Sequence, residues 1–136
     1  MFFDQTNRPS FDKARKRLRP TRNVKWCKPV GNVVKINVDA SVNNLGEASI
    51  GFIFRDHNGN CIKWKGEKLG KTSIILAETV ALRNAILEAK RDLFTHVHIE
   101  GDNATVIEAV KGSRSCPWEI GQLIRDIQVC IHSFTT

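Results

Sequence analysis

The sequence has few of the features that mark membrane, secreted or zinc-binding proteins. No run approaches the roughly 18 apolar residues that a membrane-spanning helix needs, so we expect no membrane partner. The start, MFFDQTNRPS, has no apolar stretch behind basic residues, which excludes a typical secretory signal. The four cysteines are scattered without a CxxC pair, and His96 and His98 alone make a poor zinc site. These absences favour an intracellular protein with reduced thiols, in the nucleus or the cytoplasm.

Length and composition are those of one globular domain. A chain of 136 residues can bury roughly two thirds of its unfolded surface, enough for one layered core. Its hydrophobic content of 41% and charged content of 26% are ordinary for a soluble protein. We therefore expect a single folded domain that acts as a monomer.

Positive charge is concentrated at the start of the chain. Residues 1–30 carry nine Lys/Arg and two Asp, a net charge of +7, whereas residues 31–136 carry twelve basic and twelve acidic side chains. We interpret residues 1–30 as a basic, flexible arm and residues 31–136 as the domain. The arm is either a phosphate-binding tether or nuclear import signal, or a solvated linker from a longer protein.

The hydrophobic pattern predicts the element order β-β-β-α-β-α-α. Period-two alternation indicates strands over 34–40, 48–56 and 61–69, the third an edge strand rich in lysine. Helical periodicity follows over 73–92, then a strand over 95–102 and helices over 103–111 and 117–131. This order predicts an α/β fold with a mixed sheet and helices on its faces.

Three acidic residues occupy similar positions in this scheme. Asp39 ends the first strand, Asp102 follows the fourth, and Glu78 lies in the first turn of the long helix. If the first and fourth strands are parallel neighbours, the three carboxylates meet at one edge, where all-oxygen ligands suit Mg²⁺ or Mn²⁺. Each acid also has a local explanation: an Asx turn for Asp39, a favourable helix-start charge for Glu78, and an N-cap for Asp102.

Four segments in order, VKINVDASVN, ASIGFIFRDHNGN, AETVALRNAILEA and VHIEGDNATVIEAV, resemble the ribonuclease H domain. They are most similar to its reverse-transcriptase-like branch, which is abundant in plants and related to non-LTR retroelements. The resemblance covers about residues 26–136. It implies a five-stranded sheet in the order 3-2-1-4-5, with the last strand and final helix missing from this chain.

The resemblance also implies an activity and a site. It implies hydrolysis of the RNA strand of RNA–DNA hybrids with two Mg²⁺ ions, Mn²⁺ being possible. Asp39, Glu78 and Asp102 match the family's catalytic, metal-binding acids. Backbone groups from Ala40 and Ser41 to Asn43, together with the side chains of Asn43 and Asn103, are the expected substrate contacts, although the asparagines could equally be turn residues.

This sequence departs from the family pattern at three points. Ala40 replaces the usual glycine, Asn103 stands where serine is common, and the helix that carries a fourth acid is not found; Asp126 is no substitute. We therefore expect weak metal binding and low or no turnover. The alternative is a catalytically degenerate domain that binds nucleic acid or serves as a scaffold. We expect Trp26, Trp64 and Trp118 to pack in or around the core rather than stack on bases.

Overall fold

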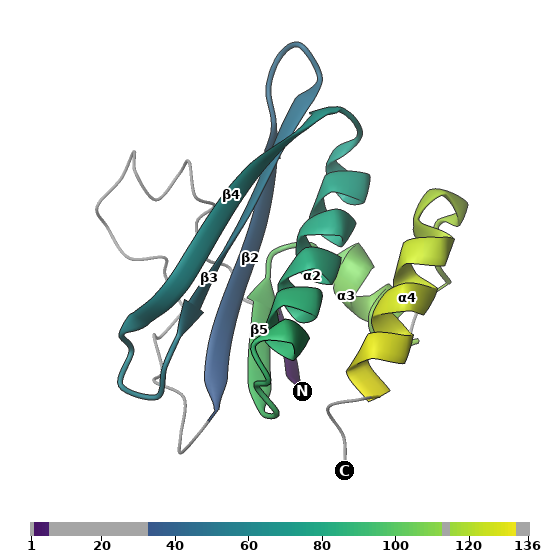
Figure 1. Ribbon diagram of the computed structural model, residues 1–136. Helices are drawn as coiled ribbons and strands as arrows, with labels where there is room; N and C mark the ends of the chain where they lie inside the picture. Colours follow the sequence, from purple (N-terminus) through teal and green to yellow (C-terminus); the bar gives the residue numbers. More distant parts are fainter. Residues whose placement is uncertain (1, 6–32, 113–114, 133–136) are drawn as a thin grey trace.

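The computed structural model describes residues 2–5, 33–112 and 115–132 (Figure 1). The elements are β1 (Phe2–Gln5), β2 (Val34–Val42), β3 (Glu47–Arg55), β4 (Cys61–Lys71), α2 (Ile74–Arg91), β5 (Val97–Gly101), α3 (Ala104–Lys111), a short 3-10 helix (Trp118–Ile120) and α4 (Gly121–His132). No helix within these ranges is long and apolar enough to cross a membrane.

The strands form one mixed sheet in the order β1-β5-β2-β3-β4. Strands β2, β3 and β4 are antiparallel neighbours, and α2 carries the chain across to β5, which runs parallel to β2. Numbered as in the sequence prediction, the order of the four predicted strands is 3-2-1-4. The predicted α/β class and the ribonuclease H-like order of these strands are therefore confirmed.

The place beside β5 is taken by a strand that the sequence did not predict. Strand β1, Phe2–Gln5, pairs in parallel with β5 from Phe2 opposite His98 to Gln5 opposite Gly101. These four residues belong to the range interpreted as a flexible arm, and that interpretation is wrong for them. The remainder of the arm, residues 6–30, lies outside the described residues.

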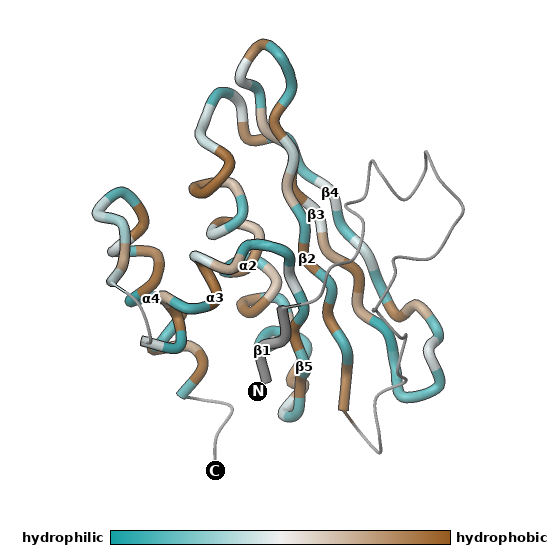
Figure 2. The backbone as a smooth tube through the Cα atoms, turned by 180° about the vertical axis from the view of Figure 1, so that it is seen from behind, coloured by the Kyte–Doolittle hydropathy of each residue, from teal (hydrophilic) through white to brown (hydrophobic). Residues whose placement is uncertain are grey.

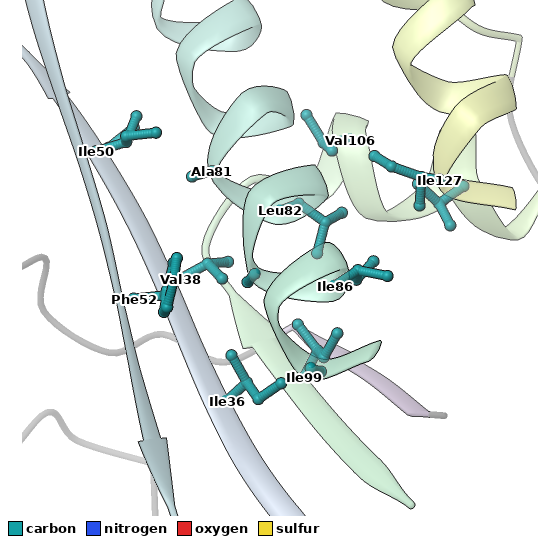
Figure 3. Packing of buried hydrophobic residues seen from close by; sticks show 14 of the residues in the cluster. Ile36, Val38, Ile50, Phe52, Ala81, Leu82, Ile86, Ile99, Val106 and Ile127 are labelled. Atoms are coloured by element: carbon teal, nitrogen blue, oxygen red, sulfur yellow. The ribbon is translucent and has the colours of Figure 1, made fainter. Parts of the chain in front are cut away.

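The helices lie together on one side of the sheet (Figure 1). Alternation in β2 turns Ile36, Val38 and Ala40 into the buried core, where they meet one face of α2. Figure 3 shows Ile50 and Phe52 of β3 and Ile99 of β5 entering the same cluster. The core thus fixes the positions of β2, β5 and α2, the three elements that carry the predicted acids.

The ends of the helices follow the sequence with small differences. Ser73 caps α2, accepting a hydrogen bond from the Leu76 amide. The predicted helix over 117–131 is divided, because the 3-10 helix precedes α4. The turn between β2 and β3 contains Gly46 at φ +81°, a backbone conformation that favours glycine.

The two described tryptophans are not in the core. Trp64 on β4 is 69% exposed and Trp118 is 92% exposed, contrary to the sequence expectation. Trp64 stands on an edge strand with few buried positions, and Trp118 precedes α4 at the periphery. Trp26 lies outside the described residues.

Candidate active site

Asp39 lies near the end of β2, on the face of the sheet opposite the helices. Its neighbours in sequence, Val38 and Ala40, enter the core, so strand alternation turns Asp39 the other way. Asp39 stands opposite Gly51 of β3 and is only 3% exposed. A carboxylate this deeply buried is costly unless its charge is compensated.

Glu78 comes from α2 and is also nearly buried, at 8% exposure. Helix α2 starts at Ile74, so Glu78 belongs to the second turn, and the first turn contains no acid. The expectation of a first-turn position was therefore wrong, and with it the explanation of Glu78 as a helix-start charge. Glu78 lines a small cavity of about 10 Å³ together with Val38, Gly101 and Asn103.

Asp102 follows the last residue of β5 and is exposed. It is not the N-cap of α3. That position belongs to Asn103, whose Oδ1 accepts a hydrogen bond from the Val106 amide at 3.1 Å. The capping explanation therefore applies to Asn103 and not to Asp102.

The two strands bring Asp39 and Asp102 to the same end of the sheet. The parallel pairing of β2 with β5 ends with Asn37 opposite Glu100. One residue further along each strand, a Cβ atom on Gly101 would stand 3.1 Å from Val38 Cγ2, so β2 and β5 remain in contact there. Asp39 follows Val38 in β2 and Asp102 follows Gly101 at the end of β5, while Glu78 lines the small cavity together with Val38 and Gly101.

The closeness of these elements is not sufficient for the three acids to form a metal-binding site. Within residues 2–5, 33–112 and 115–132, no group of three His, Cys, Asp or Glu side chains is arranged to hold a metal ion. Three carboxylates are chemically suited to Mg²⁺, but their placement does not fit a shared ion.

Of the residues predicted to contact substrate, Ala40, Asn43 and Asn103 have structural roles. The Ala40 methyl group belongs to the hydrophobic core, and Ser41 is half-buried opposite Ser49. Asn43 organises the turn: its Oδ1 accepts hydrogen bonds from the Leu45 and Glu47 amides at 2.9 and 3.0 Å. With Asn103 as a helix cap, both asparagines have the turn roles left open by the sequence, and substrate contact stays a prediction.

Behind the acids, Lys35 of β2 and Glu100 of β5 form an ion pair of 3.1 Å. Both side chains are almost completely buried, at 3% and 4% exposure. Breaking a buried pair by removing one partner is strongly destabilising, because it leaves an uncompensated charge. The pair joins the two strands that carry Asp39 and Asp102. The alternation of Lys35 with Asn37 and Asp39 indicates that Lys35 shares a face of the sheet with Asp39. Periodicity does not show that Glu100 is the partner of Lys35.

A second charged cluster joins β4 to α2 and was not predicted. Glu88, 6% exposed, forms ion pairs with Lys63 at 2.6 Å, Lys65 at 3.1 Å and Arg91 at 3.0 Å, while Lys63 also contacts Asp92 at 2.7 Å. The Lys63 hydrogen bond, which outweighs the opposing effect of burial, holds the pKa of Glu88 below its usual value. The hydrogen bond to Asp92 raises the pKa of Lys63.

Another cavity, of about 190 Å³, lies beside this cluster, between α2 and strands β3 and β4. It contains none of the three predicted acids. Its lining includes Phe52 of the core, Asn84, and Glu88 and Arg91 of the cluster. Since Glu88 already has three cationic partners, the charges around this cavity are balanced, and the cavity does not indicate a ligand.

Comparison with solved structures identifies the fold. Ribonuclease H1 of the halophilic archaeon Halobacterium salinarum is 19% identical, with a TM-score of 0.70 over 75% of this chain and 79% of that one. The N-terminal ribonuclease H domain of a Mycobacterium tuberculosis protein is 18% identical, with a TM-score of 0.70 over 76% and 77%. LC11-RNase H1, isolated from compost, was solved with an RNA/DNA hybrid; it is 19% identical, with a TM-score of 0.65 over 73% and 76%.

A family model supplies the classification that these distant likenesses do not. A search of curated proteins found no match. The family described as "Reverse transcriptase-like" matches residues 37–136, which include all three acids and most of the sheet. With its ribonuclease H-like fold, the chain belongs to the reverse transcriptase-like family.

Proposed function

We propose that this chain is a nucleic-acid-binding domain of the ribonuclease H type that hydrolyses the RNA strand of RNA–DNA hybrids. One observation carries the proposal: Asp39 and Asp102 directly follow Val38 and Gly101, which lie against each other, and Glu78 of α2 lines a small cavity with the same two residues. The family match and a fold neighbour solved with an RNA/DNA hybrid support the choice of substrate.

Mg²⁺ is the proposed cofactor and Mn²⁺ its substitute, because carboxylate oxygens suit both ions. An ion held by Asp39, Glu78 and Asp102 would supply activation of water and neutralisation of charge on the leaving oxygen, which phosphodiester hydrolysis needs. As the three side chains are not arranged for a shared ion, ion binding has to include their rearrangement. The domain is therefore expected to bind Mg²⁺ weakly and to turn over slowly. We also propose that it acts as a monomer.

The test uses a hybrid duplex with a label on each strand in turn. In Mg²⁺ the labelled RNA strand should be cut slowly, the labelled DNA strand should stay intact, and EDTA should stop the reaction. Cleavage of the DNA strand, or cleavage of RNA that persists in EDTA, would contradict the proposal.

A second candidate function is hybrid binding without hydrolysis. It is favoured by the burial of Asp39 and by the lack of a three-acid ion site among the described residues. Saturable binding of the hybrid with no cleavage in Mg²⁺ or Mn²⁺ at any enzyme concentration would select this function over the first.

A further inference from the structure

An exposed tryptophan and an exposed lysine share the face of the sheet that the helices do not cover. The register pairs Trp64 of β4 with Ile53 of β3, and Lys68 with Ser49. Because the alternate β3 residues Ile50 and Phe52 enter the core beneath α2, Ile53 and Ser49 belong to the opposite face. We call Ser49, Trp64, Gly66 and Lys68 the β4 outer surface; all four are exposed.

The lysines of β4 divide into two kinds. Lys63 and Lys65 lie on the α2 side, where Glu88 neutralises both. Lys68 lies on the outer surface, and within the described residues it forms no ion pair and faces a serine across the strands. The outer surface thus keeps an uncompensated positive charge beside an indole that is 69% exposed.

This surface continues from the candidate active site. Asp39 stands opposite Gly51, and Gly51 stands opposite Gly66, in one row across β2, β3 and β4. With neighbouring strands about 4.8 Å apart, Gly66 lies roughly 10 Å from Asp39. Asp39 and Gly51 are buried whereas Gly66 is exposed, so the residues of this row become accessible to solvent at β4.

We propose that the β4 outer surface binds the unpaired continuation of a nucleic-acid strand whose paired part occupies the candidate active site. The proposal rests on the proposed function. An unpaired base can stack on the exposed indole of Trp64, whereas bases within a duplex already stack on each other. The ammonium group of Lys68 complements the phosphate of a neighbouring nucleotide. Tryptophan beside lysine is the combination that single-strand binding surfaces use.

The experiment measures the dissociation constants of blunt hybrids and of hybrids with a single-stranded extension at either end, in metal-free buffer to prevent cleavage. The wild type should bind one of the extended hybrids about tenfold more tightly than the blunt one, as expected for stacking of one base. Trp64→Ala should remove most of this gain and leave blunt binding unchanged. Lys68→Gln should lower the salt dependence of extended-hybrid binding by about one unit of slope.

Gly66→Val tests the surface without removing a contact. A Cβ atom at position 66 meets only the Ile50 carbonyl oxygen, at 3.9 Å, and valine is favoured in strands, so the variant should fold and melt like the wild type. Its side chain projects beside Trp64 and Lys68 and should abolish the gain from the extension. Trp118→Ala is the matched control: this exposed tryptophan belongs to the 3-10 helix before α4 and not to the sheet, and α2 lies between α4 and β4 (Figures 1 and 2), so the variant should keep the gain.

Three outcomes would overturn the proposal. An extension that adds nothing to wild-type affinity at either end excludes a strand-binding role for this surface. A Trp64→Ala variant that keeps the full gain, or loses blunt and extended binding equally while still folded, excludes Trp64 as the contact. If the wild type fails to bind even the blunt hybrid, the proposed function falls and this extension of it falls too, so the two failures are distinguished.

Discussion

Gly101 of β5 lies against Val38 of β2 so closely that a Cβ atom at position 101 would stand 3.1 Å from Val38 Cγ2. This contact immediately precedes Asp102 on one strand and Asp39 on the other. It lets the two strands carry their carboxylates to the same end of the sheet. The absence of a side chain at position 101 is thus part of the geometry of the site.

Gly101→Ala should destabilise the domain and displace the two strand ends. The Val38 side chain is buried, as Figure 3 shows, so it has little room to move aside. We expect a loss of about 1–3 kcal/mol in the free energy of unfolding, typical of overpacking, measured by urea denaturation. Gly66→Ala, where the new Cβ would meet only one backbone oxygen at 3.9 Å, is the control and should be neutral. Equal stability of both variants would show that the contact is not tight.

Deletion of residues 2–5 should loosen β5. Strand β1 pairs with β5 from His98 to Gly101, so its removal leaves the backbone groups on that side of β5 without partners. Allowing about 0.5–1.5 kcal/mol for each net hydrogen bond, offset by the entropy of ordering four residues, stability should fall by roughly 1–3 kcal/mol. Hydrogen exchange should quicken at the amides of β5 while those of β3 stay protected. Unchanged exchange in β5 would show that β1 contributes no stability.

Acid should destabilise the domain partly through Glu88. Its pKa is lower in the folded state than the ordinary value of 4.5, chiefly because Lys63 donates a hydrogen bond to it. A lowered folded-state pKa means that the stabilisation is fully present above about pH 4.5 and is lost as pH falls through the folded-state value. Glu88→Gln should lower the free energy of unfolding by about 1–3 kcal/mol at pH 7 and flatten its decline below pH 4.5. A variant whose stability falls with pH in parallel with the wild type would show that Glu88 does not contribute to destabilisation by acid.

Asn103 should act as a helix cap whether or not it touches substrate. Asn103→Ala should cost about 1 kcal/mol in the free energy of unfolding, whereas Asn103→Ser, which retains a capping oxygen, should cost little. If Asn103 serves only as the cap, Asn103→Ser should also bind hybrid like the wild type. Full stability with a several-fold loss of hybrid affinity would instead assign it a substrate contact.

The sequence predicted the scaffold well where the pattern is local. Alternation in residues 34–40 predicted β2 and the opposite directions of Val38 and Asp39, and helical periodicity over 73–92 predicted α2. The predicted positions of residues within the helix turns were less accurate. Glu78 belongs to the second turn rather than the first, and the α3 cap is Asn103 rather than Asp102. Two adjacent residues with similar capping ability are not separated by spacing alone.

Features that depend on distant contacts were not predictable from pattern. Strand β1 has four residues and is defined only by its pairing with β5, nearly a hundred positions along the chain. Trp64 alternates like a core residue, but no pattern shows whether an edge strand is covered. The ion pairs of Lys35 with Glu100 and of Lys63 with Glu88 likewise join residues whose partners the primary sequence does not indicate.

The most direct test of the central claim is single-turnover cleavage of the RNA strand in a hybrid, with Mg²⁺, by the wild type and by single acid variants. Asp39→Asn, Glu78→Gln and Asp102→Asn should each reduce the slow wild-type rate by at least about a hundredfold, a loss of roughly 2.7 kcal/mol in transition-state stabilisation. Asp126→Asn, which alters an acid on α4, should match the wild type. Cleavage that survives all three substitutions in folded protein would show that these carboxylates do not form the active site.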